Sequence, residues 1–139
     1  MDPKLILYPL LAMFVLVCIV AGTMLNRRIT FYKTNRVHPQ KTATSAQMAA
    51  TIKDSRAADN FRNLFETPVL FYAVSLMIFS AGLATSFNVA LAWGFVVARY
   101  AHSYIQCTSN VVMNRFYAFV TANVFLVSLW LVTGYQLLA

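Results

Sequence analysis

The stretch "LILYPLLAMFVLVCIVAGTM", residues 5–24, contains no charged side chain. A helix of about 20 apolar residues spans the roughly 30 Å of hydrocarbon in a bilayer. The stretch is too long for the core of a signal peptide, and no small-residue cleavage motif with a polar start follows it. We therefore expect it to be a membrane span that is retained.

The composition of the whole chain extends this expectation. Of its 139 residues, 60% are hydrophobic and 11% are charged, whereas about a quarter of a soluble domain is charged. Three more apolar runs follow the first. The sequence predicts one all-α domain over residues 1–139, an integral membrane four-helix bundle with spans at about 5–26, 63–85, 88–108 and 114–137.

The distribution of charge predicts the orientation. Eight of the eleven Lys and Arg residues lie between the first and second spans, and the net charge is +7. By the positive-inside rule, the basic segment 27–62 is cytoplasmic and both termini lie on the non-cytoplasmic side of a bacterial inner membrane or an endoplasmic-reticulum-type membrane. From Ser45, a plausible N-cap, we expect a helical extension that continues without a break into the second span.

Several classes of site are not indicated. Cys18 and Cys107 both fall in apolar spans, which argues against a disulfide framework. Two histidines and two distant cysteines make no metal-binding spacing, so no metal is expected. The positive charge is explained by topology and by contact with membrane lipids, and it does not predict a nucleic-acid partner.

The only glutamate, Glu66, stands where the second apolar run begins. On a continuous helix, Asp59, Arg62, Asn63 and Glu66 share one face, at i, i+3, i+4 and i+7. For residues 54–62 this pattern also fits a solvated helix surface. For Glu66, at the edge of hydrocarbon, we expect a protein interior or a water-filled cavity with partners.

The third span carries a second polar stripe. Five residues recur at i, i+3, i+4, i+7 and i+11: Arg99, His102, Ser103, Gln106 and Asn110. Taken singly, Arg99 fits a side chain that snorkels to the interface, and His102 fits an ordinary helix–helix hydrogen bond. Together with Glu66 they predict one polar pocket at the cytoplasmic membrane boundary.

Cations end or begin the other two spans. Arg28 follows the first span and Arg115 opens the fourth. Each fits an ordinary positive-inside anchor, and each also fits a cation aimed at a bound anion. Because only one glutamate balances these arginines, the predicted pocket suits an anionic ligand.

These motifs, in this order, resemble a known family. Arg27 and Arg28 close the first helix, an Asn-x-x-Glu pattern at Asn63 precedes a proline, an Arg-x-x-His pattern starts at Arg99, and Asn-Arg precedes the fourth span. The set resembles the membrane-associated proteins in eicosanoid and glutathione metabolism (MAPEG), and it is similar to their microsomal glutathione transferase branch.

The resemblance implies a fold, an activity and a site. It implies a homotrimer that binds glutathione as co-substrate between neighbouring subunits and acts as a transferase or peroxidase on a lipophilic small molecule. Arg115 matches the arginine that faces the glutathione sulfur, the catalytic role. The glutathione-binding residues it implies are Arg28, Asn63, Glu66, Arg99, His102 and Tyr104. Tyr104 is included as a substitute for the aromatic residue that the microsomal branch has at the position of Gln106.

Two positions depart from the family pattern. Asp59 stands where the family usually has arginine, and Gln106 where the microsomal branch has an aromatic residue. They motivate an alternative, a non-catalytic protein of this fold that binds lipid or docks on a larger membrane complex. A small proton-coupled multidrug transporter is a weaker alternative, because the first span here lacks the membrane carboxylate of such transporters.

Overall fold

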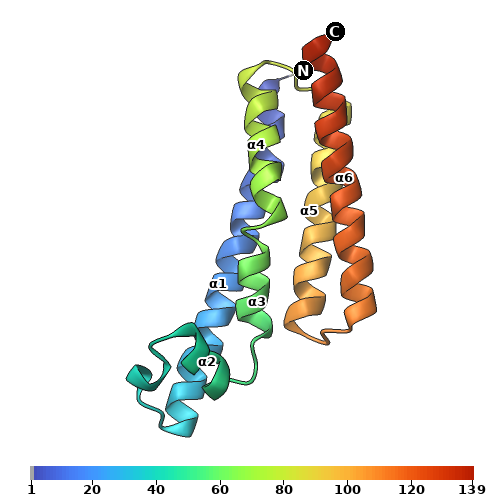
Figure 1. Ribbon diagram of the computed structural model, residues 1–139. Helices are drawn as coiled ribbons and strands as arrows, with labels where there is room; N and C mark the ends of the chain where they lie inside the picture. Colours follow the sequence, from blue (N-terminus) through green and yellow to red (C-terminus); the bar gives the residue numbers. More distant parts are fainter. Residues whose placement is uncertain (1) are drawn as a thin grey trace.

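The computed structural model describes residues 2–139 and, over that range, consists of helices joined by turns (Figure 1). Two short 3-10 helices, η1 (Pro3–Ile6) and η2 (Pro39–Thr42), accompany six α-helices. In chain order these are α1 (Leu7–Asn35), α2 (Ser45–Thr51), α3 (Arg56–Asn63), α4 (Thr67–Ser80), α5 (Ser86–Cys107) and α6 (Val112–Leu138).

The first helix is longer than the predicted span. Residues 27–35, expected to belong to the connecting segment, continue α1 because they include neither Gly nor Pro, and charge alone does not end a helix. The helix stops at Arg36, whose φ of 51° is left-handed, and Pro39 follows shortly after.

The predicted unbroken helix from Ser45 into the second span is wrong. Thr44, and not Ser45, is the N-cap of α2: its hydroxyl accepts from the Gln47 N–H while its own N–H donates to the Gln47 side chain. The helix is first interrupted at residues 52–55, between α2 and α3. A second interruption, at residues 64–66, separates α3 from α4. Pro68 explains it, because a proline ring clashes with the carbonyl four residues earlier and disfavours helix at the residue before it.

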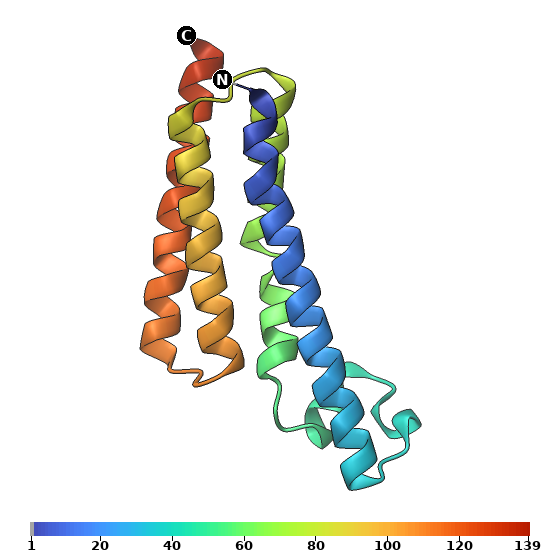
Figure 2. The same cartoon turned by 180° about the vertical axis from the view of Figure 1, so that it is seen from behind.

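Helices α5 and α6 form a closely packed antiparallel pair (Figure 2). Thr85 caps α5 by accepting from the Asn88 N–H. At Gly94 the two helices approach so closely that a Cβ would lie 2.6 Å from the Phe125 ring. Both helices begin and end within two residues of the expected spans.

The apolar core lies toward the end of the molecule that holds both termini (Figure 1). Phe71 of α4 stacks on Phe95 of α5, with ring centroids 4.5 Å apart and an interplanar angle of 18°. Met13 and Leu16 of α1 and Leu129 of α6 are buried in the same core. At the opposite end, α2 and η2 lie beside the extended tail of α1 (Figure 1).

Large apolar side chains also cover the outside of the helices. Phe14, Leu70 and Leu131 are all more than half exposed, as expected of surfaces that face lipid or another subunit. Within residues 2–139, three stretches are long and apolar enough to cross a membrane: Pro3–Asn35, Arg56–Ser80 and Val112–Leu138. α5 is not among them, since its polar stripe lowers its hydropathy. Its place as a fourth span, the trimer and the sidedness of the termini stay predictions.

Candidate functional site

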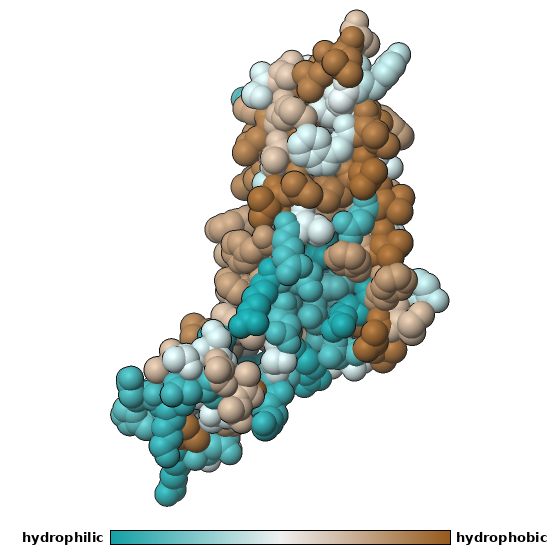
Figure 3. Space-filling view, viewed as in Figure 1, coloured by the Kyte–Doolittle hydropathy of each residue, from teal (hydrophilic) through white to brown (hydrophobic). Residues whose placement is uncertain are grey.

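A polar cleft of about 540 Å³ lies between α3 and the α5–α6 pair, at the end away from the termini. In Figure 3 polar side chains gather over this lower part of the face, and apolar ones cover the part above. The cleft is lined by Ser55, Arg56, Asp59, Asn63, Glu66, His102, Gln106, Asn110, Val112, Arg115, Phe116 and Phe119.

One wall of the cleft comes from α3 and the break that follows it. Asp59 and Asn63 stand one turn apart on α3, and Glu66 is the N-cap of α4. Since the helix is interrupted, Glu66 does not continue the α3 face as predicted, but the turn still places it on the same cleft. The Asp59 carboxylate accepts from the Ser55 hydroxyl at 2.6 Å and lies 4.0 Å from Arg62.

The floor of the cleft is formed by His102 and Gln106, two members of the predicted stripe on α5. Arg99, His102, Ser103 and Gln106 are all 3% exposed or less. Ser103 donates to the Asn60 side chain at 3.2 Å, and the Asn60 amide donates back to the Ser103 carbonyl at 3.4 Å and to Cys107 Sγ at 3.3 Å. The predicted fifth member, Asn110, lies beyond the end of α5 and is not on its face.

Arg99 is the largest fully buried side chain of the described residues. It does not snorkel: one guanidinium nitrogen donates to the Asn63 carbonyl at 3.3 Å, and Nε and Nη1 have no hydrogen-bond partner within residues 2–139. Arg99 therefore supports the cleft wall at Asn63 and does not line the cleft itself.

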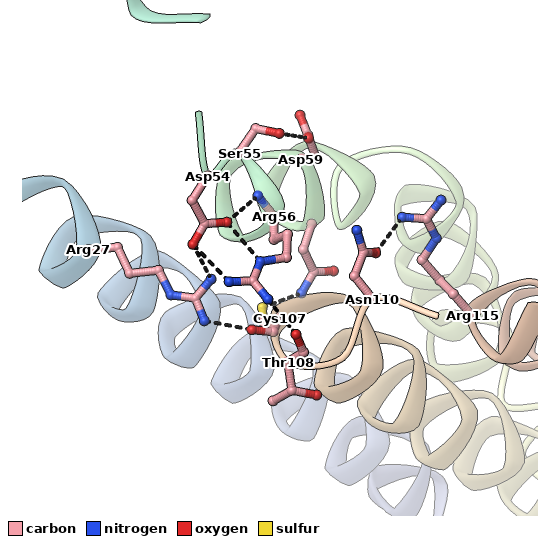
Figure 4. Close-up of polar contacts among 10 residues, drawn as sticks. Arg27, Asp54, Ser55, Arg56, Asp59, Cys107, Thr108, Asn110 and Arg115 are labelled. Atoms are coloured by element: carbon pink, nitrogen blue, oxygen red, sulfur yellow. Dashed lines mark hydrogen bonds and ion pairs between the residues drawn. The ribbon is translucent and has the colours of Figure 1, made fainter. Parts of the chain in front are cut away.

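Arg115 enters the cleft from the first turn of α6 and is held by Asn110. Asn110, with a left-handed φ of 50°, donates its N–H to the Ile105 carbonyl at 2.7 Å. Its side-chain oxygen accepts from Arg115 at 2.8 Å (Figure 4). This is the one side-chain hydrogen bond recorded for Arg115 in the part of the chain described, so its other N–H groups are free to meet a ligand.

A cluster of ionic contacts beside the cleft joins Arg27 of α1 to Asp54 and Arg56. We did not predict this cluster from the sequence. Asp54 binds Arg56 through both carboxylate oxygens, at 2.8 and 3.0 Å, and lies 3.5 Å from Arg27 (Figure 4). The two arginines donate to the carbonyls of Cys107 and Thr108 at the C-terminal end of α5. The hydrogen bond from Arg56 holds the pKa of Asp54 below its usual value of 3.8.

Two predicted ligand-binding residues lie elsewhere in the single chain. Arg28 lines a different groove, of about 850 Å³, between the tail of α1, α2 and α3. Tyr104 is 72% exposed on α5 and is not part of the cleft wall. The structure thus brings Asn63, Glu66, His102 and Arg115 together, and leaves Arg28 and Tyr104 outside.

The structure adds lining residues that sequence reasoning missed. Ser55 stands four residues before Asp59, and Phe116 and Phe119 follow Arg115 on α6. The spacing of Ser55 to Asp59 was a usable signal, since i and i+4 share a helix face. For metal binding, residues 2–139 hold no group of three His, Cys, Asp or Glu side chains placed for an ion.

Comparison with known proteins gave one match. The model of the MAPEG family matches residues 5–135, nearly the whole chain. Searches of curated proteins and of solved structures gave no match.

Proposed function

Because the chain belongs to the MAPEG family, we propose that it is a glutathione-dependent membrane transferase or peroxidase of the microsomal glutathione transferase kind. The observation that carries the proposal is the placement of Arg115. It stands on a cleft with Asn63, Glu66 and His102, held by Asn110 through one hydrogen bond and with its other donors free.

In this proposal, the cleft residues bind and activate the thiol. Glu66 accepts the α-amino group of glutathione, and the Asn63 side chain fixes the peptide beside it. The Arg115 guanidinium meets the sulfur and favours the thiolate, the reactive nucleophile. Arg99 positions the backbone beside Glu66 by donating to the Asn63 carbonyl.

The reaction then needs only an electrophile from the bilayer. The thiolate sulfur attacks an electrophilic carbon, a C–S bond forms, and the leaving group departs with its electron pair. With a lipid hydroperoxide, the sulfur attacks the terminal oxygen, an S–O bond forms as the O–O bond breaks, and the lipid leaves with the electron pair and takes a proton to become an alcohol. The resulting glutathione sulfenic acid then reacts with a second glutathione to give the disulfide and water. Phe116 and Phe119 give the cleft an apolar side for such substrates.

The predicted homotrimer enters the same proposal. Arg28 and Tyr104 belong to the glutathione site only if a neighbouring chain presents them, because both lie outside the cleft of a single chain. The exposed apolar surfaces of α1, α4 and α6 are suited to contact with lipid and with other subunits.

Turnover by the purified protein in detergent tests the proposal. With glutathione and a lipophilic model electrophile, Arg115→Ala is expected to lower kcat about 100-fold to 1000-fold, the usual loss on removing one donor to a developing or stabilised anion. Lys33→Ala is the matched control, since Lys33 is an exposed cation on α1 away from the cleft. No turnover and no glutathione binding by the parent protein would contradict the proposal.

One observation favours a second candidate, a non-catalytic protein of this fold that binds lipid or docks on a larger membrane complex. Asp59 places a carboxylate on the cleft wall, where it opposes an anionic peptide. Conjugation of an electrophile that depends on both Glu66 and Arg115 would exclude this candidate.

A further inference from the structure

The wall that α3 and its following turn present to the cleft is acidic. Both carboxylates of the wall, Asp59 and Glu66, line the same space. Asp59 is bonded to the Ser55 hydroxyl, and its only cationic neighbour in the described chain, Arg62, lies 4.0 Å away with 70% of its side chain exposed. Such an exposed pair contributes little and is easily exchanged for a ligand.

The cations of the cleft do not balance this wall. Arg56 is already engaged, since its guanidinium binds Asp54 through two nitrogens and the Thr108 carbonyl through the third. Arg115 is therefore the cleft-lining cation with free donors in the described chain. If it meets a sulfur, it is not available for a peptide carboxylate.

Two buried polar atoms point independently to a bound molecule. The oxygen Oε1 of Gln106 and Nδ1 of His102 have no hydrogen-bond partner within residues 2–139, and both side chains belong to the cleft lining. These side chains are 3% and 2% exposed. A buried polar atom left without a partner is costly, and Gln106 Oε1 requires a donor.

The groups without a strong partner are mostly acceptors: two carboxylates and an amide oxygen. Glutathione brings one ammonium group but two carboxylates, so its second carboxylate meets like charge. A like-charge contact of this kind weakens binding. An amide or an ammonium group in place of that carboxylate can donate to Asp59, which accepts a hydrogen bond from Ser55 alone in the described chain, or to Gln106 Oε1, which has no donor there.

We propose that the thiol co-substrate of this site is a glutathione-class peptide whose glycine carboxylate is masked, as an amide or by linkage to an amine, with Asp59 receiving the resulting N–H or ammonium group. The inference rests on the proposed function and names its thiol. In this assignment Glu66 binds the α-amino group and Arg115 faces the sulfur. Asp59 accepts a hydrogen bond from the masked glycine end.

Titration calorimetry with the full-length protein in detergent tests this assignment, with glutathione and glutathione amide as probes. The parent protein is expected to bind the amide about tenfold more tightly or better, because a like-charge contact is replaced by a hydrogen bond. Asp59→Asn is expected to abolish the preference, and Asp59→Arg to reverse it. Asp2→Asn, at the far end of the molecule, is the matched control and keeps the parent preference.

The outcomes separate the two proposals. Equal or tighter binding of unmodified glutathione by the parent protein overturns this inference and leaves the proposed function standing, since a cation from a neighbouring chain would then outweigh Asp59. Failure of both thiols to bind the parent protein overturns the proposed function and the inference with it. Asp59→Asn keeps the volume of the side chain, so it reads out the charge even if Asp59→Arg fails to fold.

Discussion

The two ends of the helical assembly bury different kinds of side chain. Toward the termini, Phe71 and Phe95 stack within a closely packed apolar core. Around the cleft, the buried side chains are Asn60, Arg99 and Gln106. α1, α5 and α6 extend through both ends, whereas α4 at the apolar end and α3 beside the cleft are separate helices (Figure 1). The two ends therefore differ in backbone as well as in side chains.

The difference is also one of hydrogen bonding. Near the termini, Asn88 donates to the Leu83 carbonyl and to Gln136. Of the six buried side-chain atoms without a partner in the described chain, four belong to Arg99, His102 and Gln106. Polar atoms of this kind reduce stability unless something pairs with them. We therefore expect the apolar end to contribute most of the stability, and we expect the proposed ligand to pair with unpartnered atoms of the cleft end.

The largest effect is expected from breaking the apolar end. Phe71→Ala removes a fully buried ring that stacks on Phe95 and is expected to cost about 3–5 kcal/mol of unfolding free energy. Denaturant unfolding in detergent measures it, with Phe14→Ala, an exposed ring on α1, as the control. A loss no larger than that of the control would show that the core does not carry the stability assigned to it.

A smaller effect is expected from the best-paired polar residue of the cleft end. Asn60→Ala removes three hydrogen bonds, to Ser103 and Cys107, and leaves the Ser103 hydroxyl without its partner. We expect a loss of about 1–3 kcal/mol. Asn26→Ala, at an exposed position of α1, serves as the control. If Asn60→Ala destabilises as much as Phe71→Ala, the two ends do not differ as described.

The smallest effect is expected from the ionic cluster of Arg27, Asp54 and Arg56. Asp54→Asn is expected to lower the Tm at pH 7 by about 1–3 °C, a small value because the pair is partly exposed. Since the Asp54 pKa is lowered on folding, its stabilisation is present above its ordinary pKa and is lost as the pH falls through the folded pKa.

Thermal unfolding at a series of pH values checks this. The parent protein and the Asp54→Asn variant should converge as the pH falls below the ordinary Asp pKa of 3.8. A difference that persists unchanged under acid would mean that the Asp54 carboxylate does not stabilise through its charge.

Much of this architecture is readable from the sequence, for physical reasons. The helices α5 and α6 follow from apolar runs bounded by polar turns, and the α5 stripe follows from helical periodicity, because four of its five residues are buried on one face. The prediction that Asn110 continues the stripe was wrong because α5 ends before it, at Cys107. Asn110 has a left-handed φ, which Asn adopts more readily than most residues.

Other features depend on contacts that periodicity does not encode. The clash of Pro68 with the preceding turn separates Glu66 from α3, and helical periodicity does not indicate this break. The Arg27–Asp54–Arg56 cluster depends on Arg27, which is 27 residues away from Asp54 in the chain. The placement of Arg28 away from the cleft depends on the path of α1 and α2, which residue type alone does not fix.

The central claim is that Arg115 turns the cleft into a site for a thiolate. Ultraviolet absorbance of the bound thiolate, followed against pH with saturating thiol, tests it most directly. The parent protein is predicted to show a bound-thiol pKa at least about one unit below the ordinary value near 8.5, and Arg115→Ala to return it toward that value while Lys33→Ala does not. A bound thiol that ionises near 8.5 in the parent protein, or one unaffected by Arg115→Ala, would contradict the account.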